Sequence, residues 1–314
     1  MIDFAGQVVV ITGAGRGLGR LYAKDIARRG GALVVNDLGC TISGDGADAT
    51  VADDVVAEIT GEGGIAVASH ESVATPEGGE AIVRLALEKY GRIDAVISNA
   101  GIFRPSAFDE LSPSEWRHMI NFHLDGSFFL SQPAFKAMRA QGGGRFVFIA
   151  SSAGLFGQSH AAHYAAAKSG VLGLANVIAL EGRQYGILAN TVLPFGTTRM
   201  ATETVGEARA AEIPFLRAQE PRLVAPIVTY LASRRCELSH HVFSAGVGRF
   251  ARVFVGRGEG WGAMGGDEPT AEDIEAQLGK VAGLEPFTVP LSILEEIETM
   301  CAQQGVPFDM HATI

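Results

Sequence analysis

The chain has 314 residues, of which 47% are hydrophobic and 19% are charged, and its formal net charge is −10. This length allows one large domain or two ordinary ones. The acidic balance argues against a surface that binds nucleic acid or an anionic membrane, because such surfaces carry clustered Lys and Arg side chains.

Cysteine usage and the lack of long apolar segments bear on the compartment. Cys40, Cys236 and Cys301 are far apart and odd in number, which favours a reducing compartment over a disulfide framework or a metal cage. No stretch reaches about 18 consecutive apolar residues, and the first residues lack the regions of a secretory signal. We therefore expect a cytoplasmic protein with no metal site and no membrane segment.

The N-terminal sequence predicts a strand, a glycine-rich turn and a helix. The apolar run 7–11 is followed by T-G-A-G-R-G-L-G over residues 12–19 and then by a helical pattern. A merely flexible loop is the alternative, but in this context such a turn binds a dinucleotide pyrophosphate through backbone N–H groups and the positive end of the helix. The first glycine permits the turn, the second lets backbone approach the phosphates, and the last lets helix and strand pack closely. The expected cofactor contacts are Gly13, Arg16, Gly17, Leu18 and Gly19.

A second apolar run, 32–36, ends at Asp37, near the spacing at which an acidic residue meets the adenosine ribose. A carboxylate accepts hydrogen bonds from the 2′ and 3′ hydroxyls, whereas it would repel the 2′-phosphate of NADP. Because no basic residue follows before Arg84, we predict NAD as the cofactor. The alternative is that Asp37 is a turn residue that caps the next element.

The next segments predict alternating helices and strands after a long loop. Residues 38–50 are rich in Gly, Asp, Ser and Thr, and this loop either covers the adenosine or is a surface insertion. Helices are predicted at 51–59 and 76–90, and strands at 65–68 and 93–97. Ligands of open parallel sheets collect at the carboxyl ends of the strands. We therefore expect further cofactor contacts from Ser72, Val73, Asn99, Ala100 and Gly101.

Two predicted helices are apolar on more than one side. After a helix that begins at Ser112, the first of them is a longer helix that ends near Ala140. The second continues past Lys168 with an apolar stripe at helical spacing. One face of a sheet does not account for all of these side chains. We predict that the two helices carry a subunit interface of a homodimer or homotetramer. The alternative is a fully buried helix pair beneath the C-terminal segment.

Tyr164 and Lys168 are four residues apart in an Ala-rich segment, so on a helix they share one face. An ammonium group favours the phenolate, and lowering the phenol pKa from about 10 to about 7 needs roughly 4 kcal/mol. Lys168 and a cationic nicotinamide could supply this in a dry site. Ser151 follows a predicted buried strand, 146–149, so its hydroxyl could hold a substrate oxygen. By itself the spacing of Tyr164 and Lys168 also fits a tyrosine that lies beside a solvated lysine. The glycine-rich turn at the N-terminus favours the catalytic interpretation, because it predicts a bound dinucleotide.

The C-terminal part predicts the remaining elements. A strand at 187–193 precedes cofactor contacts expected from Pro194, Thr197 and Thr198, and a helix at about 200–215 is expected to act as a lid over substrate. A helix at 223–232 and a short last strand at 241–244 complete an NAD-binding domain that we place at 1–245. The glycine-rich residues 246–314 are expected to form an extension that packs on this domain or on a partner subunit.

With T-G-x-x-x-G-x-G over 12–19, S-N-A-G over 98–101, Ser151 and Y-x-x-x-K from Tyr164, the sequence resembles the short-chain dehydrogenases/reductases. The resemblance implies an α/β, doubly wound Rossmann fold with a seven-stranded parallel sheet. It also implies that Ser151 orients the substrate oxygen, that Tyr164 moves the proton, and that Lys168 lowers the tyrosine pKa and binds the ribose. His123 stands where the family usually has a catalytic Asn, so it is a candidate for the proton relay.

A narrower resemblance covers nearly the whole chain. V-N-D-L-G over 35–39, H-L-x-G-S-F from His123 and F-x-x-G-x-G from Phe243 are similar to the (3R)-hydroxyacyl-CoA dehydrogenase unit of the peroxisomal multifunctional enzymes type 2, also called 17β-hydroxysteroid dehydrogenase type 4. That branch is NAD-linked and also has His at the Asn position. Because the hydratase and sterol-carrier segments do not follow here, we expect a free-standing relative.

The expected reaction is NAD-dependent oxidation of a secondary alcohol to a ketone. A 3-hydroxyacyl-CoA, including one with a steroid or other bulky acyl part, is the predicted substrate. A free 17β-hydroxysteroid such as estradiol or testosterone is the alternative substrate. A protein that senses NAD without turnover is the alternative from another functional class.

Overall fold

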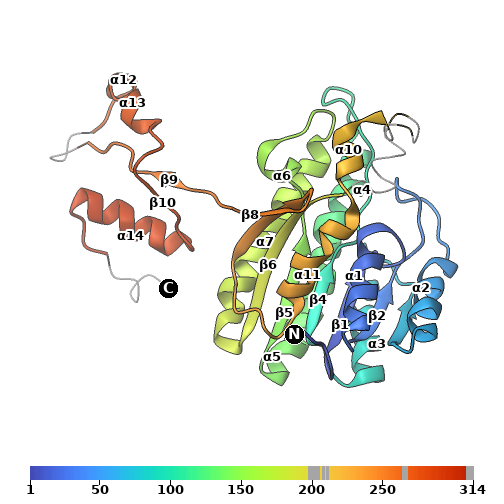
Figure 1. Ribbon diagram of the computed structural model, residues 1–314. Helices are drawn as coiled ribbons and strands as arrows, with labels where there is room; N and C mark the ends of the chain where they lie inside the picture. The colour runs from blue at the N-terminus through green and yellow to red at the C-terminus, as the bar shows by residue number, and fades with distance from the viewer. Residues whose placement is uncertain (197–205, 207–208, 210–211, 264–267, 309–314) are drawn as a thin grey trace. The chain divides into compact units, whose positions relative to one another are not determined.

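The computed structural model describes residues 1–196, 206, 209, 212–263 and 268–308. These residues form two compact units, Met1–Arg252 and Val253–Ile314. The first unit is an α/β domain with helices on both faces of one sheet (Figure 1). The sequence placed the end of this domain at residue 245, whereas the division falls after Arg252 because one more strand joins the sheet.

The sheet of the first unit has eight strands in the order β3-β2-β1-β4-β5-β6-β7-β8. The first seven in chain order pair in parallel, as predicted. The strand order reverses between β1 and β4, which is where ligands bind in open sheets of this kind. The strands are β1 (Val8–Thr12), β2 (Ala32–Asn36), β3 (Ile65–Ser69), β4 (Ala95–Ser98), β5 (Gly144–Ile149), β6 (Ile187–Phe195), β7 (His241–Gly246) and β8 (Arg249–Val253).

The eighth strand is absent from the sequence prediction, which took β7 as the last. Only Val247 and Gly248 connect β7 to β8, so the two strands form an antiparallel hairpin. Both connecting residues have positive φ, 52° and 73°, which is typical of the tight turns that match the twist of a hairpin. A valine is rare at such a position, which explains why the sequence pattern did not reveal the turn.

Helices cover both faces of the sheet. On one face α1 packs against α2 and α11, and on the other α5 packs against α3 and α7. Strands buried on both sides read as continuous apolar runs, and every residue of β1 is buried. The helices are α1 (Gly17–Arg28), α2 (Thr50–Gly61), α3 (Pro76–Tyr90), α5 (Gly126–Gln141), α7 (Ala162–Gly182) and α11 (Ala225–Ala232).

Local sequence signals explain where α3 begins and ends. The Thr75 side chain accepts a hydrogen bond from the Gly78 N–H, and Pro76 occupies the first turn, where its missing N–H costs nothing. The helix ends at Gly91, which has φ of 75°, a conformation that glycine adopts without strain. These signals place both ends where the sequence predicts them.

The segment between β4 and β5 is not the pair of regular helices that the sequence predicts. A short α4 (Pro113–Ile120) begins at the Ser112–Glu115 capping box, and α5 forms the long second helix. Between them residues Asn121–Asp125 form a π-helix. Such wider turns recur at functional sites, and this one contains His123.

Shorter helices complete the first unit. They are α6 (Ala153–Phe156), α10 (Pro214–Ala218) and the 3₁₀ turns Arg183–Tyr185 and Pro221–Leu223. Most of the predicted lid helix at 200–215 lies outside the described residues. Among the described helices, none is long and apolar enough to cross a membrane.

The second unit contains β9 (Arg257–Gly258) and β10 (Phe287–Thr288), which pair antiparallel. The rings of Phe254 and Phe287 stack with centroids 5.7 Å apart. None of the described residues in this unit is buried, so they do not form a core of their own. Its helices are α12 (Ala271–Ala276), α13 (Leu278–Val281) and α14 (Ile293–Gln304).

Candidate active site

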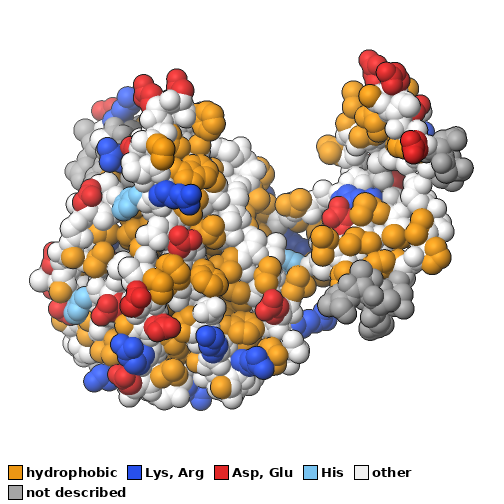
Figure 2. Space-filling view, turned by 180° about the vertical axis from the view of Figure 1, so that it is seen from behind, with side chains coloured by type: hydrophobic (Ala, Val, Ile, Leu, Met, Phe, Trp, Pro, Cys, Tyr) orange, Lys and Arg blue, Asp and Glu red, His pale blue; other side chains and the backbone are white. Residues whose placement is uncertain are grey.

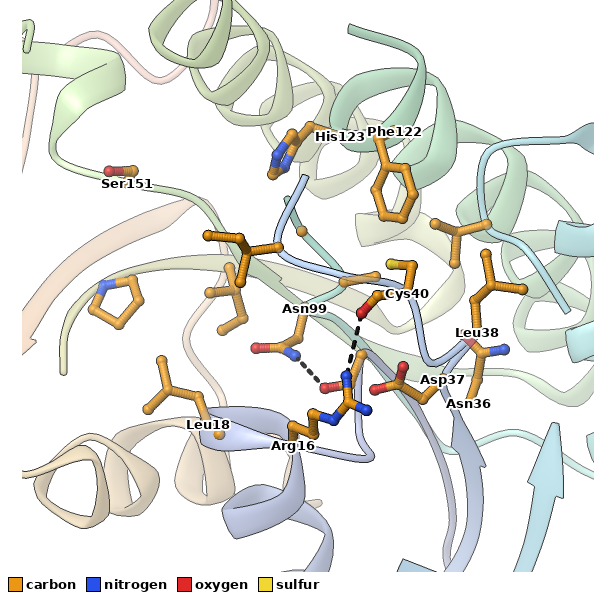
Figure 3. Close-up of a pocket in the computed structure, with 18 of the residues that line it drawn as sticks. Arg16, Leu18, Asn36, Asp37, Leu38, Cys40, Asn99, Phe122, His123 and Ser151 are labelled. Atoms are coloured by element: carbon orange, nitrogen blue, oxygen red, sulfur yellow. Dashed lines mark hydrogen bonds between the residues drawn. The ribbon is translucent and has the colours of Figure 1, made fainter. Parts of the chain in front are cut away.

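A cavity of about 250 Å³ opens at the carboxyl ends of the strands in the first unit. Figure 3 shows Arg16 and Asp37 at one end of it, and Ser151 and His123 toward the other. Predicted site residues that line this cavity are Gly13, Arg16, Gly17, Leu18, Asp37, Val73, Asn99, Ala100, Gly101, His123, Ser151, Tyr164, Lys168 and Pro194.

Among the described residues, two predicted cofactor contacts, Gly19 and Ser72, do not line the cavity. Gly19 lies behind the wall, where an added Cβ would stand 2.1 Å from the Gly13 carbonyl oxygen. Ser72 lies beneath the start of α3, where its carbonyl oxygen would stand 1.9 Å from a Cβ on Gly78. Thr197 and Thr198 lie outside the described residues.

The glycine turn is held against the end of β4. Asn99 donates side-chain hydrogen bonds to the backbone carbonyls of Thr12, at 2.9 Å, and Gly13, at 3.0 Å. A Cβ on Gly13 would lie 2.8 Å from the Ala100 Cα, so this position requires glycine. The resulting cradle of bare backbone next to a helix N-terminus suits the pyrophosphate of a dinucleotide.

Asp37 has both carboxylate oxygens engaged by backbone. One accepts from the Gly15 N–H at 2.9 Å and the other from the Gly39 N–H at 2.8 Å. The carboxylate is thereby held at the cavity wall, with lone pairs left for ribose hydroxyls. The search for a basic residue after Asp37 did not consider Arg16 in the glycine turn, which lines the same end of the cavity (Figure 3).

The 38–50 loop lines the cavity, so it is not a surface insertion away from the site. Three other segments hold it there. Arg16 Nη1 donates to the Cys40 carbonyl at 3.2 Å, and the Phe103 N–H donates to the Ile42 carbonyl at 2.8 Å. His118 Nε2 lies 3.0 Å from the Ser43 carbonyl oxygen.

Ser151, Tyr164 and Lys168 come together from the end of β5 and the first turns of α7. The Ser151 side chain lies close enough to the Tyr164 phenol to lower its pKa. Lys168 Nζ donates to the Ile149 carbonyl at 2.7 Å and lies 5.8 Å from the centroid of the Tyr164 ring. One helix face therefore presents phenol and amine to the cavity beside a hydroxyl.

Burial dominates the protonation of both titratable groups. It raises the pKa of the Tyr164 phenol, while the nearby Ser151 hydroxyl acts in the opposite direction. It also lowers the pKa of Lys168 to about 7, because a buried ammonium loses its hydration. The predicted lowering of the tyrosine pKa is therefore not seen in the protein alone. It needs a further positive charge at the site.

Among the described residues, His123 hydrogen-bonds to backbone, while its ring contacts the Tyr164 ring edge to face with centroids 5.2 Å apart. Its Nε2 lies 2.8 Å from the Ile102 carbonyl oxygen and 3.3 Å from the Ile102 nitrogen. Burial first, and then the charge of Lys168, lowers its pKa well below the ordinary value, so the ring is neutral. Its Nδ1 has no hydrogen-bond partner among the described residues. A Cβ on Gly101 would meet this ring at 2.8 Å.

The sequence profile of the short chain dehydrogenase family matches residues 7–212. The chain belongs to this family. A short-chain type dehydrogenase/reductase of Mycobacterium tuberculosis is 39% identical over 278 residues, covering 88% of this chain and 94% of that protein. As a short-chain dehydrogenase, the protein is an oxidoreductase that uses NAD or NADP.

Larger relatives share this dehydrogenase region. Peroxisomal multifunctional enzyme type 2 of Mus musculus is 40% identical over 252 residues, which are 80% of this chain and 33% of that enzyme. The structure of the full-length Drosophila melanogaster enzyme of that name gives a TM-score of 0.79 at 29% identity, covering 97% of this chain and 50% of the other. The short-chain dehydrogenase described here thus spans about a third of the mouse enzyme.

A steroid enzyme has a similar fold. The structure of 7α-hydroxysteroid dehydrogenase in complex with NADH and 7-oxo glycochenodeoxycholic acid gives a TM-score of 0.70 at 26% identity. It covers 78% of this chain and 95% of the other.

Sequence reasoning missed several residues of the short-chain dehydrogenase cavity. Most of them lie at or just after the end of a strand, or in the unusually long loop after β2. These positions are the signal that could have identified them. Phe122 had no such signal, because only the π-helix brings it to the wall. The missed residues are Asn36, Leu38, Cys40, Thr41, Ile42, Glu71, Phe122, Ile149, Ala150 and Gly196.

The low pKa of Lys168 predicts how the stability of this short-chain dehydrogenase depends on pH. Between about 7 and 10.5 the unfolded chain binds a proton at this lysine that the folded chain does not, so stability rises with pH. Below pH 7 the buried ammonium destabilises the fold. At pH 6, the Tm of Lys168→Met should therefore exceed the wild-type Tm by several degrees, since each kcal/mol of stability shifts Tm by about 2–4 °C. The difference between the two Tm values should shrink toward pH 9.

Lys24 offers the matched control. Its pKa is raised by hydrogen bonds to Glu58 and Glu62, so it stays charged in both states over this range. Calorimetry of Lys24→Met should give a Tm offset that does not change between pH 6 and pH 9. If the Tm difference between Lys168→Met and the wild type were equally independent of pH, burial would not lower the pKa of Lys168.

Proposed function

We propose that the chain is an NAD-dependent dehydrogenase that oxidises the secondary alcohol of a (3R)-hydroxyacyl-CoA to a ketone. The observation that carries this proposal is the convergence of Ser151, Tyr164 and Lys168 on one cavity with the glycine turn and Asp37. The likeness to the multifunctional enzymes over 80% of the chain supports the acyl-CoA class of substrate.

Each residue of the cavity has a separate role in the proposed reaction. Bound nicotinamide supplies a hydride acceptor and a positive charge. The Ser151 hydroxyl holds the substrate oxygen, and Tyr164 accepts the alcohol proton as the carbonyl forms. Lys168, when protonated, stabilises the phenolate, and its bond to the Ile149 carbonyl fixes its position. The alcohol loses one proton to Tyr164 and one hydride to the cofactor, so the reaction balances.

His123 has a supporting role in this proposal. Its buried Nδ1 has no hydrogen-bond partner in the part of the chain that the structure describes, and the charge of Lys168 is among the causes that lower its pKa. The ring can accept a hydrogen bond at Nδ1, because the shorter contact, to the Ile102 carbonyl, assigns the proton to Nε2. This is the orientation that a water relay between His123 and Lys168 requires.

The choice of NAD over NADP depends on the balance between Asp37 and Arg16. Asp37→Ala should weaken NAD binding by about tenfold, from the loss of one or two charge-assisted hydrogen bonds. It should strengthen NADP binding, because Arg16 is then unopposed at that end of the cavity. Titration of fluorescence with each reduced cofactor measures both constants.

Two further variants control this test. Asp54→Ala removes an exposed acid on α2 and should leave both affinities unchanged. Asp37→Ala combined with Arg16→Ala should lose the gain in NADP binding. Unchanged affinities in Asp37→Ala would mean that the adenosine is bound elsewhere.

Side-by-side turnover tests the substrate class. The purified protein with NAD should oxidise a (3R)-3-hydroxyacyl-CoA faster than a free 17β-hydroxysteroid, as followed by NADH absorbance. The steroid is retained as the second candidate because the fold likeness to 7α-hydroxysteroid dehydrogenase covers 78% of the chain. Turnover of the steroid alone would reverse the assignment. NADH binding without oxidation of either alcohol would favour a cofactor sensor.

We also propose a homodimer or homotetramer built on α5 and α7. Phe128 on α5 is 43% exposed, and Val177 and Leu180 on α7 are 50% and 46% exposed. Figure 2 shows hydrophobic side chains gathered on the face where these helices lie. Such a patch is typical of a protein interface. Leu180→Asp should dissociate the oligomer in sedimentation velocity, and a monomeric wild-type protein would contradict the proposal.

A further inference from the structure

The 38–50 loop forms one wall of the cavity. Figure 3 shows Leu38 and Cys40 on the side of the cavity where Arg16 and Asp37 also lie. Because Asp37 directly precedes the loop, a dinucleotide whose ribose is bound by this carboxylate lies next to the wall. The residues of the loop that form the wall are Leu38, Cys40, Thr41 and Ile42.

The loop is closed on itself by its own backbone. Its two ends meet where the Asp48 N–H donates to the Leu38 carbonyl at 2.9 Å. At its tip the Thr41 N–H donates to the Asp45 carbonyl at 2.9 Å, and the Gly44 N–H donates to the Thr41 carbonyl at 3.1 Å. A compact loop of this kind, with its ends close together, keeps its shape when it shifts. The position of the wall is therefore set by the contacts that the loop makes with the rest of the domain.

His118 of α4 contacts the tip of this loop. Its Nε2 lies 3.0 Å from the Ser43 carbonyl oxygen, and because a carbonyl oxygen only accepts, Nε2 is the donor. A Cβ added to Gly44, the next residue, would stand 2.7 Å from the same Nε2 and 3.2 Å from Ile102 Cδ1. Gly44 has φ of 92°, a conformation that glycine adopts without strain. The tip therefore fits closely against the imidazole only because this residue is glycine.

The imidazole of His118 also packs against a ring of the cavity. The ring centroids of His118 and Phe122 are 6.3 Å apart, and Phe122 lines the cavity. The other two bonds that hold the loop come from Arg16 and from the Phe103 N–H. His118 is exposed and does not itself line the cavity, so its substitution leaves the residues that face the cofactor in place.

We propose that His118 is a positioning residue for the cofactor, because it holds the 38–50 loop beside the bound dinucleotide through the Ser43 carbonyl. The proposal requires only that the cavity binds a nicotinamide dinucleotide, so it goes beyond the substrate class and does not depend on it. When this bond is lost, the loop keeps its shape but the wall moves away from the cofactor. The dinucleotide then dissociates faster, while its association is little changed, as is usual when contacts in a complex are lost.

Two variants of His118 separate the hydrogen bond from packing. His118→Phe keeps a ring beside Phe122 but removes the donor, and His118→Gln keeps an N–H donor near the place of Nε2. The reduced cofactor that binds more tightly, NADH or NADPH, is displaced by an excess of its oxidised form in stopped-flow fluorescence. Its dissociation rate should rise about fivefold in His118→Phe, the effect of one lost hydrogen bond. His118→Gln should restore most of the wild-type rate.

His241→Phe is the matched control. Its imidazole also contacts a backbone carbonyl, with Nδ1 2.6 Å from the Ser239 oxygen, but it lies at the amino end of β7. Its dissociation rate should equal the wild-type value. Wild-type dissociation from His118→Phe, or an equal acceleration in His118→Gln, would overturn the proposal, because the donor would then not matter.

Gly44→Ala tests the same contact from the loop, including the case in which His118→Phe does not fold. The added methyl group would displace the His118 ring, so the cofactor should dissociate at least as fast as from His118→Phe. Gly46→Ala is the control, because Gly46 has φ of 76° in the same loop but an added Cβ there has no atom within 4 Å. Both alanines carry similar backbone strain, so equal rates in these two variants would contradict the contact with His118.

The failure of this inference can be told apart from that of the proposed function. Cofactor dissociation is measured without an alcohol, so a protein that oxidises neither candidate alcohol still tests the role of His118. If the wild-type protein bound neither NADH nor NADPH, both proposals would fail. If alcohol oxidation were as proposed and His118→Phe released the cofactor at the wild-type rate, only this inference would fail.

Discussion

Tyr164→Phe is expected to abolish nearly all turnover while leaving the affinity for NAD almost unchanged. The substitution removes one oxygen atom, and with it the group that we propose accepts the alcohol proton beside Ser151. General base catalysis contributes about 10²–10⁴ to a rate, so the loss should appear in kcat. The phenyl ring still fills the space between Phe103 and His123, so the fold should be retained.

The measurement is steady-state oxidation of the preferred alcohol, together with NADH titration. Tyr90→Phe is the control, because it also removes one tyrosine hydroxyl, here one that donates to the Leu33 carbonyl at 3.3 Å. It should be fully active. If Tyr164→Phe kept more than about a tenth of the wild-type rate, the assigned base would be wrong.

Gly19→Ala is expected to destabilise the first unit and to abolish cofactor binding together. A methyl group at this position would stand 2.1 Å from the Gly13 carbonyl oxygen and 2.7 Å from the Asn99 amide nitrogen. Backbone cannot yield as a flexible side chain does, so α1 must move away from the glycine turn. Overpacking of this kind costs about 1–3 kcal/mol. It also displaces the Asn99 amide that braces the turn.

Calorimetry and NADH titration of the variant check both effects. Gly61→Ala is the control, since Gly61 ends α2 and an added Cβ there has no atom within 4 Å. This control should be neutral or slightly stabilising. Normal NADH affinity in Gly19→Ala would show that the close approach of α1 is not needed for the cofactor site.

Elements with strong local signals follow directly from the sequence. The apolar run ending at Asp37 gives β2, and Thr75, Pro76 and Gly91 give α3, each with the bounds that the structure has. Most of the residues predicted to bind the cofactor or act in catalysis line one cavity for a related reason. The carboxyl ends of parallel strands all lie at the same edge of the sheet, so residues that follow different strands are brought together there even when they are far apart in sequence.

Other features depend on tertiary contacts that no local pattern encodes. The π-helix around His123 inserts an extra residue into an otherwise helical stretch. The spacing of Tyr164 and Lys168 places them on one face but does not reveal how deeply the amine is buried. Arg16 precedes Asp37 by 21 positions, so a search downstream of Asp37 could not find it.

The hairpin of β7 and β8 also decides how the sheet ends. A parallel strand at a border leaves a row of unpaired N–H and C=O groups that can recruit strands from other molecules. Here β8 occupies that border, is only five residues long, and carries the exposed cations Arg249 and Arg252. Like charges repel when two such borders approach. A chain truncated before Arg249 would uncover β7 and should self-associate into aggregates through strand addition.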